Sequence, residues 1–143
     1  MKKLILLLTL YTSIANSQDL ITFSAEYGAE KSIGFELRKE YEQFYVGLYA
    51  ENLDQNELLF NWGFNGGLKH DLRSFTLFYG INAGLIKKTA FNANKEQKLL
   101  LGLHTELDYN INECFFIGVK LKADYSKEIN YLIRPMFKVG YKF

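Results

Sequence analysis

Hydrophobic residues alternate with polar residues or glycine along most of the chain. Because successive side chains of a β-strand point to opposite faces, this period of two predicts two-faced strands. Eight such segments can be distinguished, and none shows the period of an amphipathic helix. The pattern predicts an all-β domain. Its apolar stripes lie within 21–27, 33–37, 44–50, 58–68, 75–85, 99–109, 115–125 and 131–143.

The connections between these segments alternate in length. Short turns at one end of a sheet and longer loops at the other are typical of an antiparallel up-and-down meander. The connection near 28–31 is an exception, since its position predicts a long loop but it is tight. We therefore expect an eight-stranded antiparallel β-barrel over residues 18–143. Its short polar turns are 39–43, 69–74 and 110–114, and its longer loops are 51–57, 86–98 and 124–130.

The first 17 residues differ from the rest of the chain. Lys2 and Lys3 precede an apolar run over 4–10, and small residues follow at 15–17. This order is typical of a cleavable signal peptide, and the run is shorter than the roughly 20 residues of a membrane-spanning helix. A buried N-terminal helix or strand is the alternative. We predict that residues 1–17 direct export through the inner membrane.

Composition narrows the class of protein. Of the 143 residues, 48% are hydrophobic, 16% are aromatic and 23% are charged, and the formal net charge is +1. Such a chain is neither polar enough for disorder nor basic enough to predict a nucleic-acid partner. Its single cysteine, Cys114, cannot form an internal disulfide, and no Cys/His cluster predicts a zinc site. We expect no metal and no cofactor.

Alternation alone leaves open whether the apolar face lines the interior or the outside of the barrel. A soluble lipocalin-like barrel has an apolar interior, whereas an outer-membrane barrel exposes its apolar face to lipid. The apolar stripes carry no charged residue, which both arrangements require. Ten of the eleven glycines lie on the polar parity, and only Gly66 lies on the apolar one. Long charged side chains inside a narrow barrel need small neighbours, so the glycines favour a polar interior.

Aromatic residues gather at the ends of several apolar stripes. In the stripe 115–125, for example, Phe115 and Tyr125 flank aliphatic residues. Membrane barrels carry aromatic girdles at both water–lipid boundaries, so this distribution favours the transmembrane arrangement. The predicted girdle comprises Tyr27, Trp62, Phe75, Tyr109, Phe115, Tyr125, Tyr131, Tyr141 and Phe143.

The C-terminal segment carries a more specific signal. It ends in Phe, and its alternate positions hold Phe137, Val139, Tyr141 and Phe143. This stripe resembles the terminal-strand signal of bacterial outer-membrane barrels, and residues 18–143 as a whole resemble the outer-membrane protein X-like and opacity-type "porin family" barrels. The resemblance implies recognition by the barrel-assembly machinery and a place among outer-membrane lipid and lipopolysaccharide. Pro135 departs from the pattern, because it lacks an N–H on a paired strand, and predicts a bulge or a local break.

Charged residues on the polar parity face the interior of the predicted barrel. Acids and bases interleave across neighbouring strands, so ion pairs can form between charges that would be costly to bury alone. With a turn at 110–114, we expect Glu106 to face Gly118 and His104 to face Lys120. A structural network, a proton-sensitive plug centred on His104 and a narrow ion path all fit the pattern. The predicted network comprises Glu26, Glu36, Arg38, His104, Glu106, Asp108, Lys120, Lys122, Arg134 and Lys138.

Two features bear on activity. His104, Glu106 and Asp108 share one face, but nucleophilic catalysis also needs a Ser or Cys beside the His, and neither Cys114 nor Ser126 is placed to serve.

The basic loop 86–98 carries an apolar residue, Phe91, and is the candidate for surface recognition, although solvation alone also accounts for its composition.

These observations predict a non-enzymatic outer-membrane barrel with a structural or adhesion-type surface role and a lumen plugged by ion pairs. The first alternative is a narrow porin-like pore or a conduit for hydrophobic ligands. The second is a secreted, soluble, lipocalin-like barrel that binds a ligand in an apolar interior. The facing of the apolar stripes separates this second alternative from the other two.

Overall fold

The computed structural model describes residues 20–28, 31–54, 59–88, 97–127 and 129–143. The predicted signal peptide and the centre of the loop 86–98, with Phe91, lie outside these ranges. Within them, no helix is long and apolar enough to cross a membrane. The strands are β1 (Leu20–Gly28), β2 (Ile33–Glu40), β3 (Phe44–Asp54), β4 (Leu59–Leu72), β5 (Phe75–Lys88), β6 (Gln97–Asn110), β7 (Phe115–Ser126) and β8 (Asn130–Lys142).

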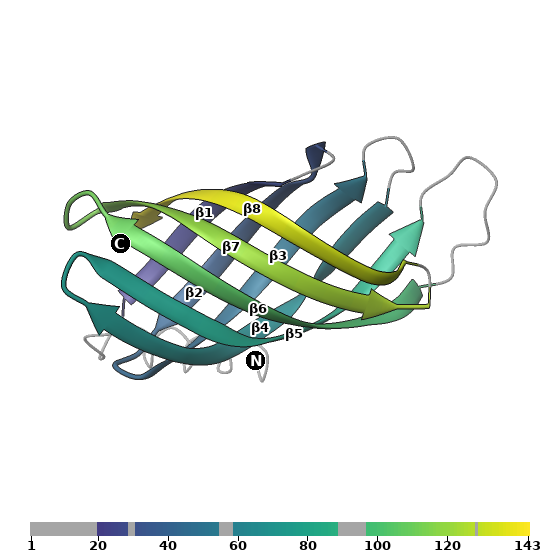
Figure 1. Cartoon of the computed structure of the whole chain (residues 1–143), viewed down its shortest axis with the longest axis horizontal. Coiled ribbons are helices and arrows are strands. Elements are labelled where there is room, and N and C mark those ends of the chain that lie inside the picture. Colours follow the sequence, from purple (N-terminus) through teal and green to yellow (C-terminus); the bar gives the residue numbers. More distant parts are fainter. Residues whose placement is uncertain (1–19, 29–30, 55–58, 89–96, 128) are drawn as a thin grey trace, which may run out of the picture.

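The eight strands form one closed antiparallel barrel (Figure 1), which confirms the predicted all-β, up-and-down fold. Each strand pairs with the next in the sequence, and β1 also pairs with β8 up to Gly28↔Met136. The backbone N–H of Phe143 donates to the carbonyl of Ile21 at 2.8 Å. The end of β8 is thus fastened to the start of β1, and the first and last strands satisfy each other's backbone groups.

The two ends of the barrel have different connections. At the turn end, β2 is linked to β3, β4 to β5 and β6 to β7, and the incoming strands finish at Glu40, Leu72 and Asn110. At the loop end lie the last residues of β1, β3, β5 and β7. Figure 1 shows the turn end on the left and the loop end on the right.

Several strands continue into segments predicted as connections. β4 and β5 leave only Arg73 and Ser74 between them, and Arg73 has a φ of 54°, the left-handed conformation of a tight hairpin. β3 continues to Asp54, and β7 and β8 leave only 127–129 between them. Backbone hydrogen bonds hold a ladder together whatever the side chains are, so polar residues at a strand end do not stop pairing. The predicted connections at 51–57, 69–74 and 124–130 were therefore too long.

The register between β6 and β7 also differs from the prediction. Glu106 lies opposite Lys120 rather than Gly118, and His104 lies opposite Lys122. The turn explains the difference, because the Asn112 side-chain oxygen accepts the backbone N–H groups of Cys114 and Phe115 at 2.8 and 2.7 Å. This local bonding shifts the centre of the hairpin toward β7. As a result, an acid stands directly opposite a base.

Contrary to the prediction, Pro135 causes no bulge, and the ladder between β7 and β8 is unbroken there. The register between β7 and β8 runs on through Leu121↔Pro135. The ladder between β1 and β8 stops at Gly28↔Met136, so Pro135 lies just beyond it and is flanked by β7 alone among the paired strands. A missing N–H is tolerated where a strand has a neighbour on one side only.

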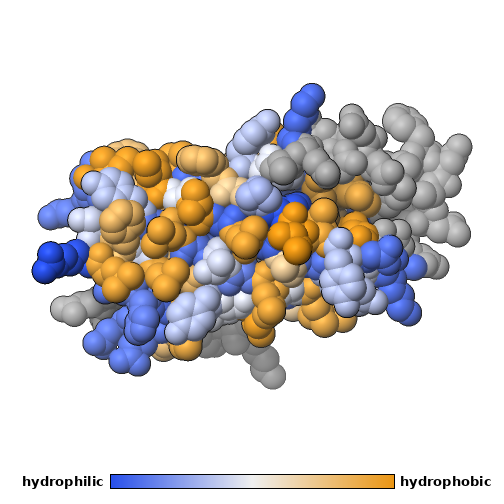
Figure 2. All heavy atoms as spheres, in the orientation of Figure 1, coloured by the Kyte–Doolittle hydropathy of each residue, from blue (hydrophilic) through white to orange (hydrophobic). Residues whose placement is uncertain are grey.

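Apolar side chains cover the outside of the barrel, and charged ones fill the inside. Leu101, Val119 and Val139 are 49%, 48% and 57% exposed, whereas Lys120 and Arg134 are 3% and 2% exposed. Figure 2 shows apolar side chains spread over the wall of one face, with hydrophilic groups projecting at the left end. This polarity is the inverse of a soluble protein, whose apolar residues are buried. The barrel therefore lacks the apolar interior of a lipocalin-like carrier.

Candidate functional site

The barrel lumen gathers the charged residues that alternation directs inward. Each second residue of a strand faces the same side, so β1, β2, β6, β7 and β8 each contribute inward side chains to one narrow space. All ten residues of the predicted network are buried there: Glu26, Glu36, Arg38, His104, Glu106, Asp108, Lys120, Lys122, Arg134 and Lys138. Apart from His104, they belong to two groups of ion pairs.

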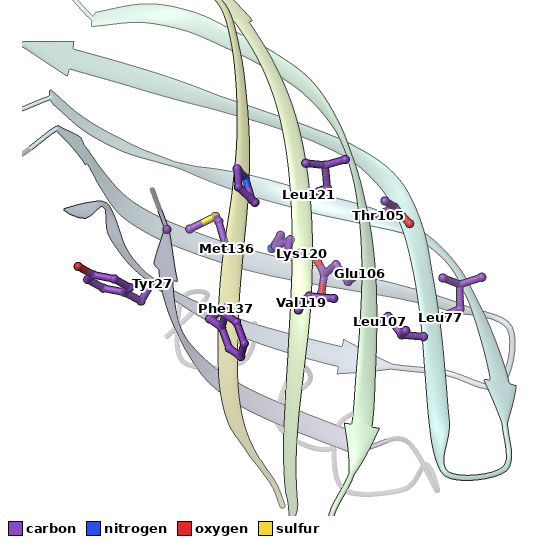
Figure 3. Close-up of a pocket in the computed structure, with 12 residues that line it drawn as sticks. Tyr27, Leu77, Thr105, Glu106, Leu107, Val119, Lys120, Leu121, Met136 and Phe137 are labelled. Atoms are coloured by element: carbon purple, nitrogen blue, oxygen red, sulfur yellow. Dashed lines mark ion pairs between the residues drawn. The ribbon is translucent and has the colours of Figure 1, made fainter. Parts of the chain in front are cut away.

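The first group, the central cluster, is built around Lys120. Its ammonium group lies 2.8 Å from Glu26 Oε1, 2.6 Å from Glu36 Oε2 and 3.0 Å from Glu106 Oε1. Oxygens of these carboxylates also lie within 4.8 Å of one another, a spacing that could hold a metal ion. Here the ammonium group of the chain itself supplies the positive charge. Figure 3 shows Glu106 beside Lys120, with outward side chains on the same two strands.

Arg38 and Lys138 complete the central cluster on the side of the turn end. Arg38 lies 3.3 Å from Glu36 Oε1, 3.2 Å from Glu106 Oε2 and 3.5 Å from Asp108 Oδ2. Lys138 contacts Glu106 and lies 3.1 Å from Asp108 Oδ2. Two cations therefore share the same two carboxylates. Multiple pairing of this kind offsets the high cost of burying each charge.

The second group, the outer cluster, lies closer to the loop end and consists of Glu51, Lys122, Asp124 and Arg134. Glu51 Oε1 lies 2.7 Å from Lys122 Nζ and 3.0 Å from Arg134 Nη2, and Arg134 Nη2 lies 2.7 Å from Asp124 Oδ2. Asn61 adds a hydrogen bond of 2.7 Å to Glu51. Two acids and two bases balance each other within this cluster.

Sequence reasoning missed Glu51 and Asp124, since both fall in segments predicted as loops. The sequence did contain the signal for both acids. Glu51 lies two residues after the inward Tyr49, and Asp124 lies two residues after the inward Lys122. Extending the alternation of 44–50 by one step would have found Glu51, and keeping 124 within the stripe 115–125 would have found Asp124. Among the described residues, these two acids are the carboxylates that pair with Lys122 and Arg134.

His104 lies between the two clusters. Its Nε2 shares a hydrogen bond with the Tyr45 hydroxyl and lies 3.6 Å from Glu106 Oε1, and its Nδ1 lies 3.3 Å from Asn82 Oδ1. Asn82 in turn donates to Asp124 at 2.6 Å. The imidazole is buried and linked to both clusters, so it is placed as a polar connection between them.

Apolar side chains lie on either side of the network, toward both ends of the lumen. The alternation of apolar and polar residues did not predict apolar side chains inside the barrel. Near the loop end, Leu53, Leu59, Ile86 and Leu100 form a buried cluster, against which Ile129 packs. Near the turn end, Arg38 stacks over Phe78 at 4.1 Å and Lys138 lies 5.4 Å from the Phe116 ring. A side chain at Gly140 would begin 2.1 Å from the Phe116 ring, so this glycine makes room for it.

The predicted girdle residues are exposed on the outer surface, and several contact one another. Near the turn end, Phe75 pairs with Tyr109 at 5.1 Å, and Phe115 with Tyr141 at 5.0 Å between ring centroids. Near the loop end, Tyr125 pairs with Tyr131 at 5.0 Å. Trp62 and Tyr27 are exposed as well, on β4 and β1. Phe137, Val139, Tyr141 and Phe143 form one outward stripe along β8 and the residue after it.

The candidate recognition loop contributes little to the described structure. Only its ends, within β5 and β6, are described, and 89–96 lie outside the described residues. Cys114 is exposed in the turn between β6 and β7. Ser126 is buried at the loop end of β7, far along that strand from Cys114. The structure thus brings the charged residues together and places these two candidate nucleophiles at opposite ends of one strand.

Comparison with known proteins identifies the fold. No family model and no curated protein matches the chain. The N-terminal β-barrel domain of Pseudomonas aeruginosa OprF has a TM-score of 0.72 at 13% identity, covering 87% of this chain and 96% of that one. The crystal structure of Yersinia pestis Ail, the attachment invasion locus protein, has a TM-score of 0.54 at 16% identity and covers 87% of this chain and 96% of that one.

Neisserial surface protein A has a TM-score of 0.52 at 8% identity and covers 87% of this chain and 94% of its own. Identities this low establish the fold alone. These solved structures are small eight-stranded barrels of outer membranes, as the resemblance in the sequence implies. The chain therefore has the closed, eight-stranded antiparallel fold of the small outer-membrane β-barrels.

Proposed function

We propose that the chain is an integral outer-membrane β-barrel, exported by residues 1–17, with a structural or surface-interaction role and no catalytic activity. The observation that carries this proposal is the inverted polarity of the barrel, with apolar side chains outside and ion pairs inside. An outward apolar surface is stable in hydrocarbon, and a closed barrel leaves no unpaired sheet edge within it. Water would favour the opposite facing.

The packing of the lumen supports a closed plug rather than a pore. An eight-stranded barrel is just wide enough to be filled by its own side chains. Here the central and outer clusters fill the middle, and the apolar side chains of Leu53, Ile86 and Leu100 lie near the loop end. A narrow ion path is the competing function, and it requires these groups to part.

The architecture supports the proposed role at the cell surface. The rigid barrel holds its loops at one end, where recognition elements are commonly placed. Ail is named for attachment and invasion, and one of its structures contains a heparin analogue, sucrose octasulfate. For this chain we propose surface contacts through the loop 86–98, including lipopolysaccharide phosphates. We also propose that the C-terminal stripe ending in Phe143 is read by the barrel-assembly machinery.

Two measurements test the proposal. On gels, unheated folded protein from the membrane fraction should migrate differently from the heated sample, and a high-salt wash should not release it. Release by salt, with no shift on heating, would contradict the membrane location. In planar bilayers, refolded protein should show no steady conductance. Steady single-channel currents would favour the pore over the plug.

A further inference from the structure

An apolar groove crosses the outer face of β1 to β4 near the turn end. It encloses about 310 Å³. Most of its lining residues are outward side chains from four strands, and Lys39 lies among them. Arg38 and Gly47, which lie at inward positions, also border it. The apolar residues that line it are Ile21, Leu37, Val46, Leu48 and Phe64.

Gly66 leaves one flank of this groove without a side chain. Lys39, Val46 and Gly66 lie in one row across β2, β3 and β4, because Val46 pairs with both of the others. Among the described glycines, Gly66 alone takes the outward parity. A Cβ there would stand 3.2 Å from the Tyr45 carbonyl oxygen, a tight contact, and 3.6 Å from Val46 Cγ1, an ordinary one. A larger side chain at this position would therefore cover Val46 and narrow the open surface beside the groove.

The groove has a charged end. Among the described strand residues, Lys39 and Lys87 are the lysines at outward positions, and they lie at opposite ends of the barrel. The Lys39 ammonium group lies 5.0 Å from the centre of the Tyr41 ring, which stacks on Phe44 at 4.3 Å. Lysine and aromatic residues at a strand end are the groups that meet lipid headgroups. The groove thus runs from the apolar wall of the barrel to the Lys39 ammonium group near its turn end.

We propose that this groove binds an anionic phospholipid of the leaflet at the turn end, with its phosphate at Lys39 and an acyl chain along Val46, Leu48 and Phe64. The inference rests on the proposed membrane location, since lipid then covers every outward surface. The positive charge of Lys39 favours an anionic headgroup. Because Lys39 lies near the turn end, the lipid belongs to the leaflet at that end.

A second furrow shows why Lys39 matters. It lies across β5 to β8 and the end of β1, and its outward side chains include Leu107, Val119 and Phe137 (Figure 3). Among the described residues that line it, the charged ones are Glu106 and Lys120, and both belong to the buried central cluster. Without an outward cation, this furrow can hold an acyl chain but cannot distinguish one headgroup from another.

Trp62 makes the proposal measurable. It is the single tryptophan of the chain, it faces outward, and it lies on β4 two residues from Phe64 of the groove. Lipids with brominated acyl chains quench a nearby tryptophan. The protein would be placed in phosphatidylcholine nanodiscs that contain a small fraction of brominated phosphatidylglycerol or, separately, of brominated phosphatidylcholine.

We expect phosphatidylglycerol to be enriched about fivefold around Trp62, as judged by quenching, which corresponds to the interaction of one lysine with an anionic leaflet. Lys39→Gln should abolish the difference, and Gly66→Leu should reduce it. The matched control, Lys87→Gln, should leave it unchanged. Equal quenching by both lipids in a protein that has inserted and shifts on gels would overturn this inference alone. An equal loss from Lys87→Gln would also overturn it, and failure to insert would contradict the proposed function itself.

Discussion

Removing the ammonium group of Lys120 is the most direct test of the lumen network. Lys120→Met keeps the length of the side chain but deletes the charge that lies 2.6–3.0 Å from three carboxylates. At an effective dielectric constant of about 20, each such contact is worth about 6 kcal/mol before desolvation is subtracted. Deleting one partner of a buried ion pair typically costs about 3–5 kcal/mol, because the remaining charge stays buried. We expect a loss of this size in the free energy of unfolding.

Urea unfolding in phospholipid vesicles, followed by Trp62 fluorescence, would measure the loss. Lys87→Met, which removes an outward lysine near the loop end, should change stability by no more than about 0.5 kcal/mol. Glu26 has its ion pair with Lys120, so adding Glu26→Gln to Lys120→Met should recover about 1–3 kcal/mol. A loss below about 1 kcal/mol in a folded Lys120→Met protein would refute the reasoning. It would show that water, and not the protein, solvates these carboxylates.

Three further predictions address the wall and the C-terminus. Ile117→Lys places a charge on the exposed apolar face and should lower the stability of the folded barrel in a membrane by about 2–4 kcal/mol. The folded fraction on gels measures this loss, and no effect would mean that this face does not meet lipid. Gly140→Ala should destabilise the barrel by about 1–3 kcal/mol, because the new Cβ would stand 2.1 Å from the Phe116 ring and 2.8 Å from the Phe23 carbonyl oxygen. Adding Phe116→Leu, which removes the ring contact, should restore part of the urea resistance, and no recovery would mean that the ring is not the cause. Phe143→Ala should lower the amount of protein assembled in cells while refolding in detergent stays normal, and equal losses in both assays would indicate a stability defect instead.

Much of the fold could be predicted because its governing pattern is short-range. Alternation identified each strand, and the glycines on the polar parity indicated a crowded polar interior. Gly140 shows why, since it accommodates a ring from the neighbouring strand. Strand ends were less predictable, because backbone pairing continues through polar residues such as Glu51 and Asp124.

Register and the composition of the lumen depended on interactions that alternation does not encode. The Asn112 side chain sets the hairpin between β6 and β7, and a pattern of apolar and polar residues carries no trace of that bonding. Phe116 and Leu100 lie inside the barrel although they are apolar, because the lumen near each end needs volume to be filled. A pattern of apolar and polar residues predicts a single polarity for each face of the sheet. Here the inner face is charged in the middle and apolar near both ends.

The pairing of β1 with β8 means that the barrel can close only when its first and last strands meet. The chain can add hairpins one after another, but the cylinder cannot shut until its C-terminal strand reaches the strand made first. Until then both margins of the growing sheet present unsatisfied amides and carbonyls, a state prone to mispairing with other chains. Such long-range closure is also intrinsically slow.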